Sequence, residues 1–246
     1  MASQLPLILT MDTATPCSSV ALTAGSRRDG HLVGSICLSG NITHSRRLLS
    51  AIDHLTREVG VDKGAIDGIA VSLGPGSFTG LRIGMATAKG LAAASGKPLL
   101  GASTLDALAG QCVTSRLICT LLDARKKEVY AAFHRCNSEG IAERVGEMQV
   151  LAPEKLVDLI DEPVLMIGDG VATYGPLFRR LLDERAIFAP AHLHTPSAAA
   201  LGMIAGEMLA RGELLDIGEA VPVYVRSSDA ELNLLKKTEQ ERAARS

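Results

Sequence analysis

The sequence predicts a mixed α/β protein in which one unit of strands and helices occurs twice. The first indication is a continuous apolar run, residues 5–11, that ends at Asp12 and is typical of a strand buried on both faces. The second is the predicted order of strand, strand, strand, helix, strand and helix that follows. The third is the return of this order about 110 residues later, where a buried strand again ends at an aspartate, Asp123.

Each predicted element rests on hydrophobic periodicity and on the turn residues that bound it. In the first half we expect strands at 5–11, 18–24, 31–38, 67–73 and near 98–101, a helix from an N-cap at Thr43 to about Val59, a glycine-rich loop at 74–80 and helices at 81–95 and near 104–113. In the second half we expect strands at 116–122, 128–135, 141–151 and 164–167, and helices at 153–160, 174–183 and 197–210. The apolar face of the helix that ends near Val59 is expected to contain Leu48, Leu49, Ile52, Leu55 and Val59.

These elements divide the chain into two lobes and a tail. We expect an N-terminal lobe of residues 1–110 and a C-terminal lobe of residues 111–225, whose last helix can pack back on the first lobe. The charged residues 226–246 are expected to be mobile or to form a short solvated helix.

Composition excludes several classes of protein. Of the 246 residues, 47% are hydrophobic and only 3% are aromatic, so the core is aliphatic and a stacking surface for single-stranded nucleic acid is not expected. The formal net charge of −2 lacks the excess of basic residues that is typical of proteins that bind nucleic acid on their own. Apolar runs are too short for a membrane span or a secretory signal, which predicts a soluble, cytoplasmic protein.

The cysteines predict neither a zinc site nor a disulfide framework. Their number is odd and no two of them have C-x-x-C spacing; they are Cys17, Cys37, Cys112, Cys119 and Cys136. Free, buried thiols in a reducing compartment are the expected state.

The residues after the first strand admit two interpretations. Asp12, Thr13 and Thr15 stand where open α/β sheets gather ligands, and they could hold hydrated magnesium and phosphate. The same residues could simply form a turn that closes the strand. In the second half, Gly168, Asp169 and Gly170 follow a strand in the same way and could contact a nucleotide or form a turn.

The glycine-rich residues 74–80 precede a helix, where exposed amides favour anions. They lack the Lys-Ser/Thr pair of a Walker A loop, and Pro75 breaks the G-x-S-x-G pattern of a nucleophile elbow. The helix after them carries a stripe of small residues at four-residue steps: Gly80, Gly84, Ala88 and Ala92. This stripe could pack on the protein's own sheet or receive a partner helix.

The histidines do not form a recognisable catalytic or metal-binding motif. His192 and His194 would share one face of a strand, but no third metal ligand accompanies them, and there is no H-E-x-x-H motif. A peptidase is therefore not supported.

Taken together, five segments resemble the TsaB (YeaZ) family. They are MDTAT at 11–15, HSRRLL at 44–49, SLGPGSFTGLRIG at 72–84, DARKKEVY at 123–130 and PVYVR at 222–226. The resemblance covers about residues 5–228, and the block around residues 74–84 is its most specific part.

The resemblance implies an actin-like/Hsp70-like ATPase (ASKHA) fold of two RNase-H-like domains, which agrees with the duplication. It also implies a role in tRNA threonylcarbamoyladenosine modification, as a non-catalytic scaffold or activator of the TsaD threonylcarbamoyltransferase. Expected partners are TsaD in a heterodimer, the TsaE ATPase, a second copy in a homodimer when TsaD is absent, and tRNA only through the complex. The alternative is an ATP-dependent small-molecule phosphotransferase of the same fold, using Asp12 for magnesium.

The resemblance also separates two groups of candidate residues. TsaD-like proteins carry an H-x-x-x-H metal motif where residues 101–107 here have no histidine, so no metal site is expected. Ala14 stands where active kinases of the fold have a glycine, which indicates a pseudoenzyme with weak or absent ATP binding. The remnants of the nucleotide cleft would be Asp12, Thr13, Thr15, Asp123, Arg125, Gly168, Asp169 and Gly170, and the partner interface would be Gly80, Gly84, Ala88, Leu91 and Ala92. On this hypothesis, Gly84→Leu or Ala88→Glu abolishes TsaD binding and leaves the chain folded.

Overall fold

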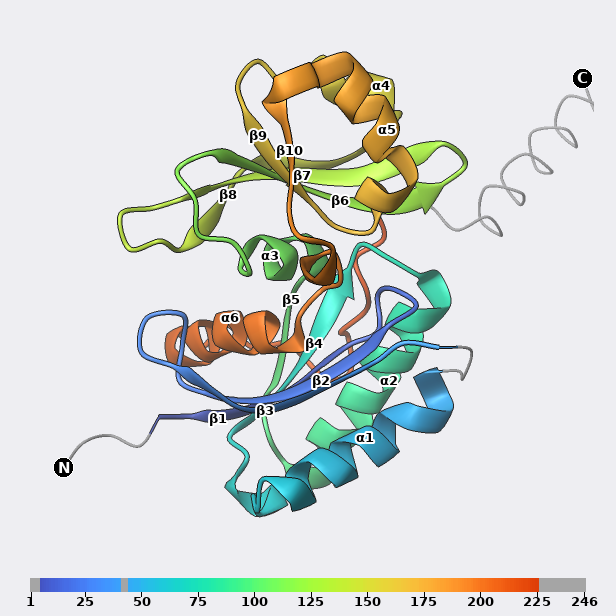
Figure 1. The fold of residues 1–246 in the computed structure, drawn as a ribbon. Coiled ribbons are helices and arrows are strands. Elements are labelled where there is room, and N and C mark those ends of the chain that lie inside the picture. Colours follow the sequence, from blue (N-terminus) through green and yellow to red (C-terminus); the bar gives the residue numbers. More distant parts are fainter. Residues whose placement is uncertain (1–4, 41–43, 226–246) are drawn as a thin grey trace, which may run out of the picture.

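The computed structural model describes residues 5–40 and 44–225 and contains two lobes, each built on a five-stranded mixed sheet (Figure 1). The strand order is β3-β2-β1-β4-β5 in the first sheet and β8-β7-β6-β9-β10 in the second. Each order starts from the third strand of its lobe, so equivalent strands stand at the same place in both. In both sheets the first strand of the lobe lies at the centre, antiparallel to the second strand and parallel to the fourth. The expected duplication of an α/β unit is confirmed.

In the first lobe, two helices cover one face of the sheet. Its strands are β1 (Leu7–Asp12), β2 (Ser18–Ala24), β3 (His31–Leu38), β4 (Gly68–Gly74) and β5 (Leu99–Ser103). Its long helices are α1 (His44–Glu58) and α2 (Phe78–Ser95). Alternation along β1 sends Leu9 and Met11 into a core shared with these helices and Ile8 to the opposite face.

The second lobe repeats this arrangement with shorter helices. Its strands are β6 (Leu117–Arg125), β7 (Glu128–Cys136), β8 (Ala142–Leu151), β9 (Val164–Ile167) and β10 (Ala186–Phe188). Its helices α4 (Pro153–Val157) and α5 (Gly170–Leu182) pack on one face of the sheet. The three-residue β10 was not predicted, because it is too short for a periodic pattern.

Two helices connect the lobes. The short α3 (Thr104–Ala109) leads from the first lobe to the second, and α6 (Ala198–Arg211) returns to the first. Figure 1 shows α6 on the face of the first sheet opposite α1 and α2, and α6 contacts β1, β2 and α3. Our division at residue 110 stays a proposal; the expected N-cap Thr43 and the tail 226–246 lie outside the described residues.

Several element boundaries differ from the prediction for identifiable reasons. Helix α2 begins at Phe78 and not at residue 81, because the Ser77 hydroxyl accepts a hydrogen bond from the Gly80 amide and caps it. Helix α5 begins at Gly170 and not at residue 174, with Pro176 inside it. Strand β6 continues beyond Asp123 to Arg125, and α3 and α4 are shorter than predicted. In the described part of the chain, no helix is long and apolar enough to cross a membrane.

Candidate functional site

The loop between β1 and β2 holds the first group of predicted site residues in a closed environment. Asp12, Thr13 and Thr15 are 1%, 0% and 5% exposed. The Ala14 amide donates to Asp12 Oδ1 at 3.1 Å, whereas Oδ2 has no hydrogen-bond partner among the described residues. Burial raises the pKa of Asp12 to about 6, and the nearby Ser72 hydroxyl and the Ala14 amide only partly oppose it.

The glycine-rich segment 74–80 closes this loop. The Ser77 amide donates to the Ala14 carbonyl at 2.7 Å, and the Thr13 hydroxyl donates to the Gly80 carbonyl at 2.8 Å. A Cβ at Gly76 would lie 2.4 Å from the Ala14 carbonyl oxygen, and one at Gly80 would lie 2.0 Å from that of Thr13. The glycines therefore allow two backbones to touch, and the anion-binding interpretation of this segment is not supported.

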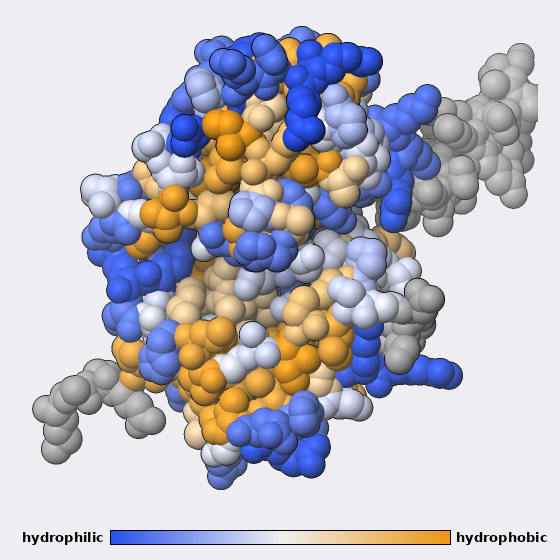
Figure 2. Space-filling model, viewed as in Figure 1, coloured by the Kyte–Doolittle hydropathy of each residue, from blue (hydrophilic) through white to orange (hydrophobic). Residues whose placement is uncertain are grey.

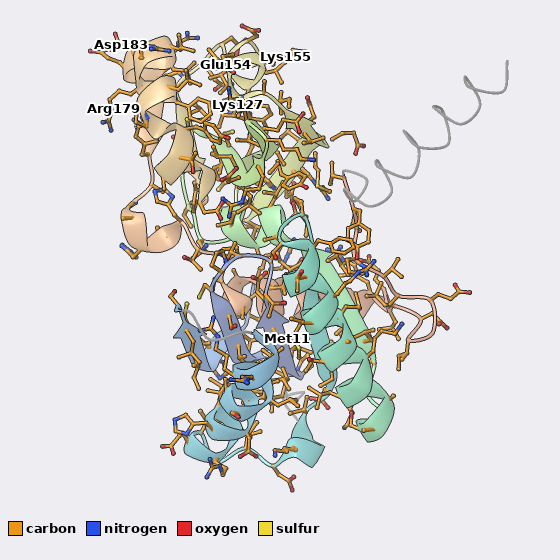
Figure 3. The ribbon with its side chains drawn as sticks, turned by 90° about the vertical axis from the view of Figure 1, so that its right-hand side faces the viewer. Met11, Lys127, Glu154, Lys155, Arg179 and Asp183 are labelled. Carbon is orange, nitrogen blue, oxygen red and sulfur yellow. The ribbon has the colours of Figure 1, made fainter. Side chains whose placement is uncertain are left out.

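Magnesium and phosphate do not fit at this loop. A phosphate-bound cation needs carboxylate oxygens that can be reached from the cleft together with solvent. The Asp12 carboxyl is instead enclosed by the protein, with segment 74–80 packed on the loop that follows it. Figure 3 shows the preceding residue, Met11, inside the first lobe close to α1 and α2.

The small-residue stripe of α2 faces inward, which corrects its assignment as a partner surface. A Cβ at Gly84 would lie 2.4 Å from Thr13 Oγ1. Ala88 and Ala92 are 0% exposed and belong to the core of the first lobe. With Gly80 also buried, only Leu91 among the five predicted interface residues is partly exposed. The small side chains let α2 approach the protein's own β1 and β4.

The second group of predicted site residues forms one hydrogen-bonded cluster at the ends of β6 and β9. Asp169 Oδ1 accepts a hydrogen bond from the Asp123 amide at 3.0 Å, and Asp123 Oδ1 accepts one from the Arg125 amide at 2.8 Å. Partial burial raises the pKa of Asp169. Gly168 and Gly170 press against Leu121, where a Cβ at Gly168 would lie 1.9 Å from the Leu121 carbonyl oxygen.

The hairpin that joins β6 to β7 ends in three basic residues with left-handed backbones. The φ angles are 61° at Arg125, 52° at Lys126 and 63° at Lys127. Non-glycine residues rarely adopt this region, and each costs roughly 1 kcal/mol. Figure 3 shows Lys127 in the outer part of the second lobe, away from Met11. The tip of the β6–β7 hairpin is therefore exposed where the β1–β2 loop is buried, whereas the Asp123 side chain is only 15% exposed and Gly168 and Gly170 are buried.

The expected pairing of His192 and His194 on a strand is wrong. They lie at a 3-10 turn, Ala191–Leu193, and His194 Nδ1 accepts a hydrogen bond from the Gly168 amide at 3.2 Å. Burial lowers the pKa of His194, which agrees with a neutral ring that accepts. Within residues 5–40 and 44–225, no group of three or more potential ligands (His, Cys, Asp or Glu) could hold a metal ion.

Sequence reasoning missed an apolar hollow between α1 and α2. It encloses about 400 Å³ and is lined by Leu9, Leu49, Ile52, Leu91 and Ala94, with Asp53, Lys63 and Lys97 among its polar residues. Leu49 was predicted to face the core but is 56% exposed, because it lies beside the buried stripe of Leu48, Ile52 and Leu55. The sequence contains one signal for this hollow: Leu49 is apolar but lies one position outside the buried stripe of α1.

Small residues also cover the outer surface of α2 beside this hollow. Ala86, Gly90, Ala93 and Ala94 are exposed, and no atom lies within 4 Å of a Cβ built at Gly90. We call these four residues and Leu49 the α1–α2 face. The opposite flank of the helix is covered, because Lys89 donates to the carbonyls of Gly218 and Ala220. In the view of Figure 2, hydrophobic residues gather on the lower half of the molecule, where Figure 1 shows the first lobe.

A second hollow, of about 490 Å³, lies between the lobes and is charged. Arg27 forms a bidentate ion pair with Glu207 on α6, at 2.7 and 3.0 Å, and donates to the Ala142 carbonyl on β8 at 3.0 Å. Asp106 on α3 pairs with Arg144 at 3.3 Å and with the buried His134 at 2.9 Å. These pairs join the lobes, and nothing in the sequence pattern predicted them.

Two lobes of this topology around connecting helices define the actin-like/Hsp70-like ATPase fold. Component A of (R)-2-hydroxyglutaryl-CoA dehydratase from Acidaminococcus fermentans has a TM-score of 0.51 at 9% identity and shares the fold alone. YeaZ from Pseudomonas aeruginosa is 31% identical with a TM-score of 0.74, covering 89% of this chain and 100% of that chain. A further Pseudomonas aeruginosa structure, of an uncharacterized protein with similarity to peptidase YeaZ, is 32% identical with a TM-score of 0.77.

Sequence relatives give the family. The family described as TsaD, tRNA N6-adenosine threonylcarbamoyltransferase, matches residues 40–234. The tRNA threonylcarbamoyladenosine biosynthesis protein TsaB of Escherichia coli is 30% identical over 230 residues, which are 91% of this chain and 96% of that protein. The Bacillus subtilis TsaB protein is 27% identical, with the same two shares. This chain belongs to the TsaB family.

Proposed function

We propose that this chain is a non-catalytic subunit of tRNA threonylcarbamoyladenosine biosynthesis that binds and activates TsaD. Membership of the TsaB family supports the pathway. The observation that carries the non-catalytic role is the closed β1–β2 loop, in which Asp12 is 1% exposed beneath segment 74–80. A carboxylate that cannot meet magnesium and phosphate from the cleft cannot serve phosphoryl transfer there.

The α1–α2 face is the proposed docking surface for TsaD. It combines an apolar hollow with exposed small residues, so a partner helix can approach the backbone of α2 closely and place an apolar side chain beside Leu49. The family match also argues for this partner. The chain fits the TsaD family over 195 residues (40–234), so the two proteins are paralogues, and paralogues can pair through equivalent surfaces about a pseudo-two-fold axis.

The same surface accounts for the remaining proposed partners. Without TsaD, a second copy of this chain would cover the α1–α2 face in a homodimer, because the surface is apolar and self-complementary pairing of helices is geometrically simple. TsaE would join the TsaD complex, and tRNA would be held mainly by the other subunits, in agreement with the net charge of −2. These proposals place the chain in the cytoplasm.

Omission from a reconstituted reaction tests the proposed function. TsaC, TsaD, TsaE, tRNA, threonine, bicarbonate and ATP are combined with and without this chain, and threonylcarbamoyladenosine is measured in the tRNA. We expect a loss of at least about tenfold when the chain is omitted, which corresponds to about 1.4 kcal/mol. Full activity without the chain would contradict an activating role.

Calorimetry with magnesium and ATP separates the proposal from the phosphotransferase alternative. A phosphotransferase predicts submicromolar ATP binding by the isolated chain, together with turnover that is lost in Asp12→Asn. The buried Asp12 instead predicts weak or absent binding that Asp12→Asn does not change.

A further inference from the structure

Two cysteines that are twenty residues apart in the sequence meet beside the closed loop. Cys17 lies immediately before β2 and Cys37 lies near the end of β3, and the β2–β3 hairpin brings them together. Their sulfur atoms are 2.9 Å apart. A disulfide joins its sulfur atoms at about 2.05 Å, so a modest side-chain movement closes the gap without moving the strands.

The two thiols differ in accessibility. Cys17 is 5% exposed, whereas Cys37 is exposed on β3, the edge strand of the first sheet. An exposed thiol beside a buried one is a suitable pair for a two-step oxidation, in which a reagent from solution meets the outer sulfur first. We propose that Cys17 and Cys37 form a reversible intramolecular disulfide when oxidised glutathione reaches β3.

The proposed reaction is balanced as thiol–disulfide exchange. The Cys37 thiolate attacks one sulfur of oxidised glutathione, which forms a mixed disulfide and releases the first glutathione thiol. The Cys17 thiolate then attacks Cys37 Sγ and releases the second. Two protein thiols lose two electrons and two protons in total, and one glutathione disulfide gains them.

The surroundings of Cys37 make this oxidation slow at neutral pH. Partial burial of the thiol is the main reason that the pKa of Cys37 rises to about 12, and the adjacent Cys17 thiol and the Asp12 carboxyl raise it further. Arg47, whose guanidinium donates to Ser18 Oγ and the Pro16 carbonyl, opposes the shift. Only a small fraction of Cys37 is thiolate, so the rate of disulfide formation should rise about tenfold per pH unit over pH 7–9.

Differential alkylation and peptide mapping test the proposal on the full-length chain. The reduced protein is incubated with oxidised glutathione, alkylated and digested with trypsin, which cleaves after Arg27, Arg28 and Arg46 and thus separates the two cysteines. We expect a cross-linked pair of peptides with Cys17 and Cys37 that disappears on treatment with dithiothreitol. We also expect the melting temperature to rise by roughly 5–10 °C, because the bond closes a loop of about twenty residues.

Cys119 provides an internal control for unfolding, because it is 0% exposed. It must stay unalkylated until denaturant is added, which ensures that the cross-link forms in the folded protein. Cys37→Ser is the matched variant, expected to melt at the wild-type temperature under reducing conditions and to lose the rise on oxidation. The proposal is overturned if, after oxidation, Cys37 is still alkylated in the folded protein and Cys17 is alkylated once denaturant is added, or if the cross-link appears only when Cys119 is labelled without denaturant.

Discussion

The β1–β2 loop and the β6–β7 hairpin occupy the same place in the two lobes but have opposite environments. In the first lobe, segment 74–80 covers the loop, and Asp12 is enclosed. In the second lobe, Arg125 is 79% exposed at its side chain and heads a strained basic tip. Topology alone did not decide these environments, because the sheets are equivalent. In the first lobe, Gly76 and Gly80 bring a second backbone against Ala14 and Thr13, whereas in the second lobe Gly168 approaches Leu121 on β6 and leaves the hairpin tip exposed.

The largest expected effect sharpens the distinction between the inner and outer faces of α2. Ala88→Glu places a charge at a site with 0% exposure and should destabilise the chain by about 4 kcal/mol or more. Ala86→Glu, two residues away on the exposed face, should change stability by less than about 0.5 kcal/mol but disrupt binding to TsaD. Urea denaturation and co-elution with TsaD measure the two effects.

This prediction replaces our earlier expectation that Gly84→Leu or Ala88→Glu leaves the chain folded. Gly84 has no room for a larger side chain beside Thr13 Oγ1 and Val71. If Ala88→Glu were as stable as Ala86→Glu, the inner face of α2 would not be packed as described.

One substitution made at two glycines of α2 tests how the first loop is closed. Gly80→Ala should cost about 3 kcal/mol, because its Cβ would lie 2.0 Å from the Thr13 carbonyl oxygen and backbone must move. Gly90→Ala should stabilise the helix by about 0.7 kcal/mol, because nothing lies within 4 Å and alanine is the better helix former. If thermal or urea unfolding shows that Gly80→Ala lowers and Gly90→Ala raises the free energy of unfolding, the close approach of Gly80 to Thr13 is supported. Equal changes in the two variants argue against it.

The raised pKa of Asp12 predicts a pH-dependent stability that the basic hairpin does not share. Well below the reference pKa of 3.8, the carboxyl is protonated in both the folded and the unfolded chain and does not affect stability. Between pH 4 and 6 it ionises only in the unfolded chain, so stability falls, by about 3 kcal/mol if the pKa is about 6 and the reference is 3.8.

Asp12→Asn removes this titration. Its amide can still accept from the Ala14 amide and can donate to the Ser72 hydroxyl, which lacks a partner among the described residues. The variant should therefore exceed the wild type in stability at pH 7–8 by up to about 3 kcal/mol and lose most of this advantage at pH 4. Urea midpoints across this pH range measure it, and a difference that does not vary with pH would refute the raised pKa.

The smallest expected effect concerns the strained tip of the second lobe. Replacing Lys126 and Lys127 by Asn and Gly supplies the residues that favour positive φ and should stabilise the chain by about 1 kcal/mol. Replacing both by alanine removes the charges but keeps the strain, so it serves as the control. A gain in thermal stability from alanine as large as that from Asn-Gly would assign the effect to charge.

The sequence predicted the elements better than it predicted the site. Strands β2, β3 and β9 were bounded correctly, because short apolar or β-branched runs are flanked by turn residues. The structure brings Asp123 and Asp169 within hydrogen-bond distance, and the role of the candidate cleft residues stays a prediction. The sequence could not predict which face of α2 is buried. Small residues occupy both faces, so the two faces do not differ clearly in hydrophobicity.

Contacts between segments far apart in the sequence were the second feature that could not be predicted. Nothing local indicates that Gly76 and Gly80 close over Ala14 and Thr13, or that Arg27 reaches Ala142 in the second lobe. The register of the β2–β3 hairpin indicates the Cys17–Cys37 pair, whereas C-x-x-C spacing does not, because the two cysteines are twenty residues apart.

The most direct test of the account is the rate of threonylcarbamoyladenosine formation in the reconstituted reaction, with Asp12→Asn and Ala86→Glu each replacing the wild-type chain. If the chain acts through its outer surface, Asp12→Asn retains at least about half of the wild-type rate, and Ala86→Glu loses about tenfold or more, equivalent to about 1.4 kcal/mol. An inactive Asp12→Asn beside a fully active Ala86→Glu would mean that the chain works through its cleft.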